Sequence, residues 1–279
     1  MLSLHSRRPF SSVLAGDRRS HRRGLSIEFS DYREYRPGDD LKYVDWKAYG
    51  RLEKLFLKLF VDEEDLNVHL LIDNSKSMSF GETTTKWEYA QRAAAAIGFI
   101  ALHENNRVDA AAFNTAISSR TNPLRGDQSI PVFLKALEKL PPPDGGTQFS
   151  QVIRKYAASS PPSGLVIIFS DFFDLEIAAG LANLAARNHQ TALIQVLDRL
   201  EVSPDFDGDI NLIDSESGVT REVTLSSYEI QQYKTRLDQY TAELIQSAGK
   251  YGADFVRVVT DEPVETLVLH SLRTAGIVK

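Results

Sequence analysis

The sequence predicts an α/β fold, in which a doubly wound, mostly parallel β-sheet carries helices on both faces. Short runs of branched apolar residues alternate with helical segments along most of the chain, as expected for β-α-β units with right-handed crossovers. Two of these runs, residues 68–72 and 165–170, are almost continuously apolar, which is typical of strands buried on both faces. Each run stops at a carboxylate, Asp73 or Asp171.

The composition is that of an ordinary globular protein. The chain has 279 residues, of which 42% are hydrophobic and 25% charged, so it can bury a large core. It has no cysteine, which excludes disulfides, thiolate catalysis and cysteine zinc sites and fits a reducing compartment. The longest apolar stretch, residues 93–102, is well short of the roughly 20 residues of a membrane span, and the N-terminus lacks a signal-peptide core. We expect a cytoplasmic protein that does not bind a membrane.

Residues 1–24 form a basic arm on an otherwise acidic chain. They contain six arginines and one acid, Asp17, which gives a charge of +5, whereas the whole chain carries −6 and the remainder therefore −11. Such an arm is able to bind nucleic acid or an acidic partner surface. A solvated, flexible arm is the favoured interpretation, and nucleic-acid binding through the arginines is the alternative.

Residues 25–66 read as an N-terminal extension, because they are too few to build a core of their own. Apolar and polar side chains alternate over residues 26–36, as in a half-buried strand. A short helix with an aromatic face is expected over residues 41–51, and a second strand over residues 54–61.

Four residues of this extension are a second candidate interaction surface: Asp39, Asp40, Asp45 and Trp46. Asp39 and Asp40 belong to Pro37-Gly38-Asp39-Asp40, a segment with strong turn chemistry. A structural role, in which the three acids cap turns, is the favoured interpretation.

Residues 67–279 form the main domain, in which strands and helices alternate. Thr85 and Glu88 are the two ends of a capping box that opens an alanine-rich helix. Three prolines, residues 141–143, end a later helix near Leu140. The other elements expected in this part are strands at 108–113, 116–121 (antiparallel), 165–170 and 191–197, and helices at about 148–158 and 175–187.

After residue 197 the alternation lapses. Residues 210–213 and 219–225 flank a polar turn and predict a β-hairpin insertion at about residues 198–225. A long amphipathic helix is expected next, and the chain then finishes with one more strand and one more helix. These three elements are predicted at about 228–249, 254–259 and 262–273.

A candidate metal site lies where the strand of residues 68–72 ends. In Asp73-x-Ser75-x-Ser77, alternate residues of an extended loop point the same way, so three oxygen ligands can face one cation. Loops at the carboxyl ends of neighbouring strands converge in a doubly wound sheet. Asp171 and Thr147, which follows two glycines, can therefore join the first loop. Each residue alone has an equal alternative as a turn-stabilising or helix-capping group, but the five together favour a metal.

These five residues resemble the metal-ion-dependent adhesion site of von Willebrand factor A domains, which have a Rossmann-type fold. One departure is Phe172, which follows Asp171 where the common pattern has glycine. More narrowly, the chain is similar to the bacterial domain-of-unknown-function 58 family from about residue 22 to its end. The motifs that carry this similarity are Gly24-x-x-x-Glu28-Phe29, Tyr35-Arg36-Pro37-Gly38-Asp39-Asp40, Val44-Asp45-Trp46-Lys47, Ser170-Asp171-Phe172, Phe206-Asp207-Gly208-Asp209 and Thr260-Asp261.

The resemblance implies a magnesium ion, with manganese as the alternative. The hydroxyls of Ser75, Ser77 and Thr147 would bind it, while Asp73 and Asp171 hold its waters and these hydroxyls in place. With so few anionic ligands the ion is under-neutralised, so an acidic residue of a client protein can complete its coordination. The resemblance also implies a MoxR-type AAA+ ATPase as partner and a chaperone-like role in maturation or complex assembly.

An enzyme is the weaker expectation. The sequence has no G-x-S-x-G nucleophile elbow, no Walker phosphate loop and no H-E-x-x-H motif. A magnesium-dependent hydrolase is the alternative, with Asp73, Asp171 and Asp174 as its candidate bases. We therefore expect a non-enzymatic, protein-binding function.

Overall fold

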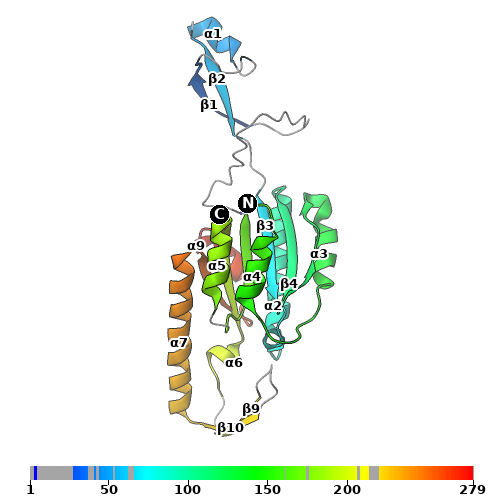
Figure 1. Cartoon of the computed structure of the whole chain (residues 1–279), viewed down its shortest axis with the longest axis vertical. Coiled ribbons are helices and arrows are strands. Elements are labelled where there is room, and N and C mark those ends of the chain that lie inside the picture. The colour runs from blue at the N-terminus through cyan, green and yellow to red at the C-terminus, as the bar shows by residue number, and fades with distance from the viewer. Residues whose placement is uncertain are drawn as a thin grey trace. The chain divides into compact units, whose positions relative to one another are not determined.

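The structure of the chain is a computed structural model that describes residues 3–4, 28–36, 41, 44–52, 54–61, 66–159, 161–173, 176–205, 208–213 and 220–278 (Figure 1). The chain divides into two compact units. The smaller unit is Ser11–Asp65, and the larger one combines Met1–Phe10 with Leu66–Lys279.

The smaller unit contains an antiparallel strand pair and one short helix. Strand β1, Glu28–Glu34, pairs with β2, Phe56–Val61, and helix α1, Trp46–Leu52, lies between them in sequence. Asp45 begins this helix: one oxygen of its carboxylate accepts the backbone N–H groups of Lys47 at 2.9 Å and of Ala48 at 3.2 Å. Such a cap stabilises a helix by about 1 kcal/mol.

The predicted interaction surface in this unit is only partly described. Asp45 is 7% exposed and its carboxylate caps α1, which is the structural role that the sequence favoured, whereas Trp46 is 61% exposed. Asp39 and Asp40 lie outside the described residues. Most of the predicted arginine arm lies outside them too, but Leu4 is packed rather than free. It forms a β-bridge with Val278, and its N–H donates to Glu104 at 2.8 Å.

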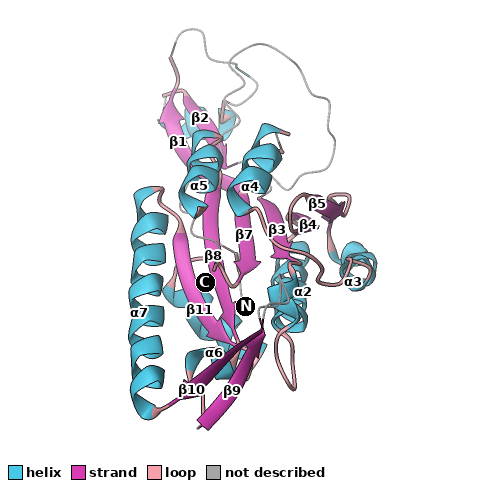
Figure 2. Ribbon diagram, turned by 60° about the horizontal axis from the view of Figure 1, so that its bottom comes forward, coloured by secondary structure: helices cyan, strands magenta, loops and turns pink. Residues whose placement is uncertain are grey.

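The larger unit is built on a seven-stranded sheet (Figure 2). Five strands are parallel and lie in the order β11-β8-β7-β3-β4, and β5 and β6 pair antiparallel with β4 at one edge. This confirms the predicted α/β fold with a mostly parallel sheet. The strands are β3 Asn67–Asp73, β4 Arg107–Phe113, β5 Ile117–Arg120, β6 Leu124–Arg125, β7 Leu165–Ser170, β8 Gln190–Leu197 and β11 Asp254–Val259.

Helices cover both faces of this sheet, because its strands are apolar on both sides. Leu70 and Ile72 of β3 belong to the core cluster that contains the alanine-rich helix α2 on one face, and Leu71 belongs to the cluster that contains residues of α4, α5 and α7 on the other. The principal helices are α2 Lys86–His103, α3 Ile130–Glu138, α4 Phe149–Ala158, α5 Ile177–Ala186, α6 Arg199–Val202 and α7 Ser227–Lys250. The capping box predicted at Thr85 and Glu88 is present.

Two details differ from the sequence prediction. Strand β6 was not expected, because two residues have no periodicity of their own. The closing helix predicted at about 262–273 is not continuous: it consists of α8 Val264–Thr266, a π-helical turn Leu267–Ser271 and α9 Leu272–Thr274.

The predicted hairpin is present as β9 Gly208–Ile213 and β10 Thr220–Leu225. Within the described ranges, no helix combines the length and the apolar character that a membrane crossing requires.

A polar group lies on the sheet away from its carboxyl edge, in which His69 and Asp109 are buried and Arg120 is partly exposed. Nδ1 of His69 lies 2.6 Å from Oδ1 of Asp109, and Nε2 lies 2.9 Å from the carbonyl oxygen of Pro162. Both neighbouring atoms are hydrogen-bond acceptors, so each ring nitrogen of His69 faces an acceptor. Arg120 completes the group by donating from Nε to Oδ2 of Asp109 at 2.9 Å.

His189 packs its ring against His69, with ring centroids 5.7 Å apart. It is 2% exposed, and neither of its ring nitrogens has a hydrogen-bond partner among the described residues. Burial, followed by the electrostatic interaction with His69, lowers the pKa of His189 from 6.5 to about 4. His189 is therefore held neutral in the folded protein at a pH at which it takes up a proton in the unfolded chain.

This difference predicts a loss of stability in acid. Between pH 6.5 and 4 the unfolded chain binds a proton at His189 that the folded chain does not, so His189 should lower the free energy of unfolding by up to about 3 kcal/mol as the pH falls through this window. Urea titrations of the wild type and of His189→Phe across this range will measure it. The variant should lose less stability than the wild type; parallel curves would contradict the prediction.

Candidate metal centre

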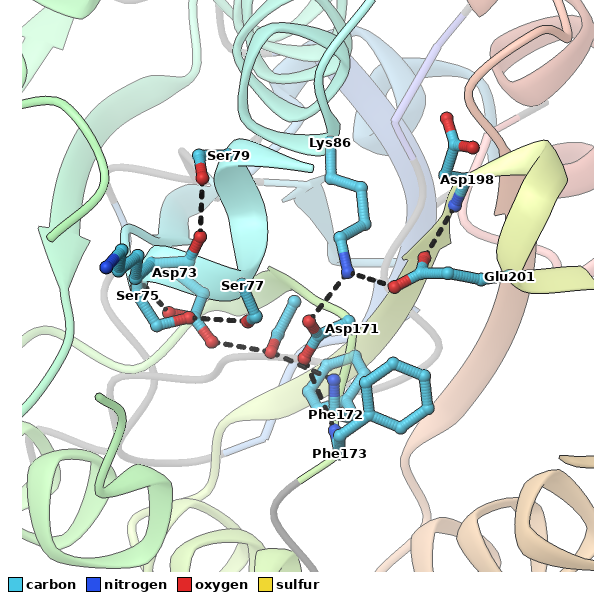
Figure 3. Close-up of polar contacts among 12 residues, drawn as sticks. Asp73, Ser75, Ser77, Ser79, Lys86, Asp171, Phe172, Phe173, Asp198 and Glu201 are labelled. Carbon is cyan, nitrogen blue, oxygen red and sulfur yellow. Dashed lines mark hydrogen bonds and ion pairs between the residues drawn. The ribbon is translucent and has the colours of Figure 1, made fainter. Parts of the chain in front are cut away.

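Loops at the carboxyl edge of the sheet bring four of the five predicted residues together, namely Asp73, Ser75, Ser77 and Asp171 (Figure 3). Asp73 ends β3, Ser75 and Ser77 lie at the start of the 3₁₀ turn η2, Lys76–Ser79, and Asp171 follows β7. After β3 the chain forms α2 on one face of the sheet, and after β7 it forms α5 on the other. Strand order therefore reverses between β3 and β7, which is where doubly wound sheets bind their ligands.

Asp73 is fully buried and uses both carboxylate oxygens. Oδ1 accepts the backbone N–H of Ser75 at 2.8 Å, and Oδ2 accepts the hydroxyl of Ser170 at 2.7 Å. Burial, followed by the negative charge of Asp171, raises the pKa of Asp73 to about 7, although these hydrogen bonds lower it. Two carboxylates held close together out of water are a place where a cation is electrostatically favoured.

The two serines of the predicted motif face each other. The Oγ atoms of Ser75 and Ser77 lie 3.1 Å apart, and Ser75 is fully buried. The D-x-S-x-S spacing thus gathers one carboxylate and two hydroxyls beside the end of β3, as predicted.

The loop of Thr147 is attached to the loop of Asp73 by two backbone hydrogen bonds. The N–H of Lys76 donates to the carbonyl of Gly145 at 2.7 Å, and the N–H of Asp144 donates to the carbonyl of Asn74 at 2.8 Å. The alternative role of Thr147, as the cap of α4, is wrong: Gln148 holds that position, with no side-chain cap bond.

The side-chain hydroxyl of Thr147 is a further candidate ligand. Its Oγ1 is buried and has no hydrogen-bond partner among the described residues. A buried hydroxyl without a partner costs about 1–3 kcal/mol by mutational data, and such groups in native proteins call for an explanation. Coordination of a cation would supply the missing partner.

Asp171 forms a buried ion pair that the sequence did not indicate. Nζ of Lys86 donates to Oδ2 of Asp171 at 2.9 Å and to Oε1 of Glu201 at 2.7 Å. The Lys86 side chain is 1% exposed and that of Asp171 is 3% exposed. Burial lowers the pKa of Lys86, but the charges of Asp171 and Glu201 outweigh burial and raise the pKa above its ordinary value. Lys86 is therefore a permanent buried cation beside the candidate site.

Phe172 occupies the position at which the common A-domain pattern has glycine. Its φ is +55°, in the left-handed region that glycine adopts without strain. The backbone is held there from both sides: the N–H donates to Oγ of Ser170 at 3.0 Å, and the carbonyl accepts the hydroxyl of Tyr240. The ring is 2% exposed and packs on Phe149, with centroids 5.7 Å apart. Packing of the ring thus holds a conformation that phenylalanine rarely adopts.

The donors in this site suit a hard divalent cation. Three hydroxyls and two carboxylates are oxygen ligands of the kind that magnesium prefers, and the partnerless oxygen of Thr147 is the observation that supports the fit. Over the described part of the chain, no group of three or more His, Cys, Asp or Glu side chains is placed to hold a metal. A centre here would depend on the hydroxyls of Ser75, Ser77 and Thr147, with Asp73 and Asp171 beside them.

The fold and the site define a class: a Rossmann-type α/β domain with oxygen-rich loops where strand order reverses. The chain belongs to the family described as "Protein of unknown function DUF58", which matches residues 31–243. This confirms the family that the sequence motifs indicated.

Relatives of similar length occur in mycobacteria. The chain is 28% identical over 264 residues to an uncharacterized protein of Mycobacterium bovis, covering 93% of this chain and 83% of that protein, and it matches an uncharacterized protein of Mycobacterium tuberculosis to the same extent. Among solved structures, it is similar to the conserved hypothetical protein BatB of Bacteroides thetaiotaomicron, with 14% identity, a TM-score of 0.49, and coverage of 76% of this chain and 98% of that one. An aerotolerance-related membrane protein of Bacteroides fragilis gives 17% identity, a TM-score of 0.45, and coverage of 75% and 99%.

Sequence reasoning missed three residues that hold the site together: Ser170, Lys86 and Glu201. Ser170 binds Asp73, and Lys86 joins Asp171 to Glu201. The capping boxes that begin α2 and α6 fix the backbone around Lys86 and Glu201, and both boxes can be read from sequence. Their sequence signal identifies helix starts, but it does not indicate that the two side chains meet.

Proposed function

We propose that the chain is a non-enzymatic adaptor that binds an acidic side chain of a partner protein through a divalent metal ion. Ser75, Ser77 and Thr147 would hold the ion, and Asp73 and Asp171 would orient these hydroxyls and bound waters. The ion supplies a Lewis-acidic position for a carboxylate. The chain's own residues supply hydroxyl and carboxylate oxygens from loops at the carboxyl edge of the sheet.

One observation carries the proposal: Thr147 Oγ1 is buried and finds no hydrogen-bond partner in the part of the chain that the structure describes. Its loop is attached to the Asp73 loop by two hydrogen bonds. An ordinary structural loop would leave such a hydroxyl in water or bond it to the backbone. A metal ligand explains both the burial and the missing partner.

For the partner we propose a MoxR-type AAA+ ATPase, acting with this chain in chaperone-like maturation or complex assembly. The support is the resemblance of the motifs, together with the lack of a phosphate-binding motif in this sequence. ATP hydrolysis would then come from the partner, while this chain recognises an acidic residue of the ATPase or of its client.

Titration calorimetry of magnesium into chelator-stripped protein tests the metal. The wild type should bind magnesium saturably, and Asp73→Asn, which preserves shape but removes the charge, should show no saturable binding. Thr147→Val should weaken binding roughly 10–100-fold without lowering the free energy of unfolding, because this hydroxyl forms no hydrogen bond with any residue that the structure describes.

Ser79→Ala is the matched control in the same loop. Its hydroxyl is exposed and donates to the carbonyl of Lys76 at 2.7 Å, so the variant should bind magnesium as the wild type does. Absence of binding in the wild type, or binding that survives Asp73→Asn, would refute the metal centre. Capture of the purified ATPase with magnesium and with chelator then tests the partner separately.

A further inference from the structure

Lys86 is a lysine with almost no access to water, placed directly on a carboxylate of the candidate metal centre. Its ammonium contacts Oδ2 of Asp171 at 2.9 Å and Oε1 of Glu201 at 2.7 Å. Buried lysines occur where they are paired, and here the pairing joins the site to helix α6. Figure 3 shows Lys86 between the two carboxylates, with Asp73 and the serines on the other side of Asp171.

Both ends of this contact are held firmly. Lys86 is the first residue of α2, and its N–H donates to the carbonyl of Phe80 at 2.9 Å. Glu201 is fixed through its second oxygen, Oε2, which accepts the N–H of Asp198 at 2.8 Å. Movement of the ammonium away from Asp171 would therefore leave a buried charge without its partner.

The charges decide how strongly the site attracts a metal. Asp73 and Asp171 attract a divalent cation, but Lys86 already neutralises Asp171 and repels any second cation near it. Glu201 has the opposite effect, because it shares the ammonium with Asp171. Because the side chains of Lys86 and Asp171 are buried, these interactions are weakly screened.

We propose that Lys86 is an internal counter-cation that competes with the metal for Asp171, and that Glu201 moderates this competition. The inference rests on the proposed metal centre and adds its regulation. Lys86 keeps the affinity for the metal low and keeps the positive charge of a bound ion in excess, so that an acidic partner ligand is favoured. Glu201, on α6, sets how much of the ammonium's charge acts on Asp171.

The test is the magnesium affinity of two single variants and their combination, by calorimetry on the full chain. Lys86→Met removes the competing charge and should tighten magnesium binding by at least about tenfold, given the Coulomb energies of neighbouring charges. Glu201→Gln leaves the whole ammonium to Asp171 and should weaken binding by about tenfold. The double variant restores the net charge and should bind within a few-fold of the wild type.

Opposite changes in magnesium affinity for Lys86→Met and Glu201→Gln would distinguish this role from a purely structural one. If Lys86 and Glu201 only stabilise the fold, both single variants weaken magnesium binding, and that result overturns the inference, as does unchanged affinity in Lys86→Met. Should Lys86→Met fold poorly, the double variant decides: an affinity restored from that of Glu201→Gln to near the wild-type value supports the inference, and an affinity no higher than that of Glu201→Gln overturns it. A wild type that binds no magnesium would instead refute the proposed function itself, so the two failures are distinguishable.

Discussion

Replacing Asp109 with alanine is expected to lower the free energy of unfolding by about 3–5 kcal/mol, because it leaves the buried ring of His69 and the partly exposed guanidinium of Arg120 without their shared carboxylate. Asp109 is 3% exposed and accepts hydrogen bonds from both His69 and Arg120. Burial raises its pKa, but His69 and Arg120 outweigh burial and hold the pKa below the ordinary value. Urea denaturation near neutral pH will measure the loss.

The chain contains a matched control for this variant. His103 and Asp127 form the same type of pair, 3.0 Å apart, but their side chains are 45% and 62% exposed. Asp127→Ala should therefore change the free energy of unfolding by less than about 1 kcal/mol. A loss for Asp109→Ala as small as that of Asp127→Ala would show that Asp109 does not hold His69 and Arg120 as described.

Replacing Phe172 with alanine is expected to lower the free energy of unfolding by about 3–5 kcal/mol, because a buried ring is removed from the core. The left-handed backbone at this residue also predicts an unusual order of stability between its glycine and alanine variants. Phe172→Gly should be more stable than Phe172→Ala by about 1 kcal/mol, because only glycine adopts φ of +55° without strain. In most helices and strands the order is the reverse.

Thermal or urea unfolding of the two Phe172 variants checks this ordering, with Phe173→Ala as the control. Phe173 is the next residue but is 44% exposed, so its removal should cost much less than removal of Phe172. An alanine variant more stable than the glycine variant would mean that the backbone at residue 172 relaxes out of the left-handed region.

The elements of the main domain were largely predictable because their signals are local. The run 68–72 is nearly all apolar, and it forms β3 with both faces covered. Thr85 and Glu88 mark the start of α2 within four residues of sequence. The π-helical turn Leu267–Ser271 and the two-residue strand β6 were not predictable, because neither has a periodicity that distinguishes it.

The candidate site was predictable only in part, because only some of its contacts join residues that are close in sequence. Asp73, Ser75 and Ser77 lie together in sequence, so their convergence follows from the spacing. The contacts of Lys86 join it to residues 85 and 115 positions away in the chain. Nothing in its immediate neighbours distinguishes it from a solvent-exposed lysine at a helix start, and only the tertiary fold reveals that it is buried.

The central position of β3 has a consequence for the newly made chain. Asp109, the partner of His69 on β4, follows it by 40 residues in the chain, whereas Ser170, at the end of β7, follows Asp73 by 97 residues. At a ribosomal rate of roughly 5–20 residues per second, that interval lasts about 5–20 s. Throughout it one edge of an apolar strand is without its neighbour and open to pairing with other chains. The strand that ends in Asp73 is therefore the segment that most needs protection during translation.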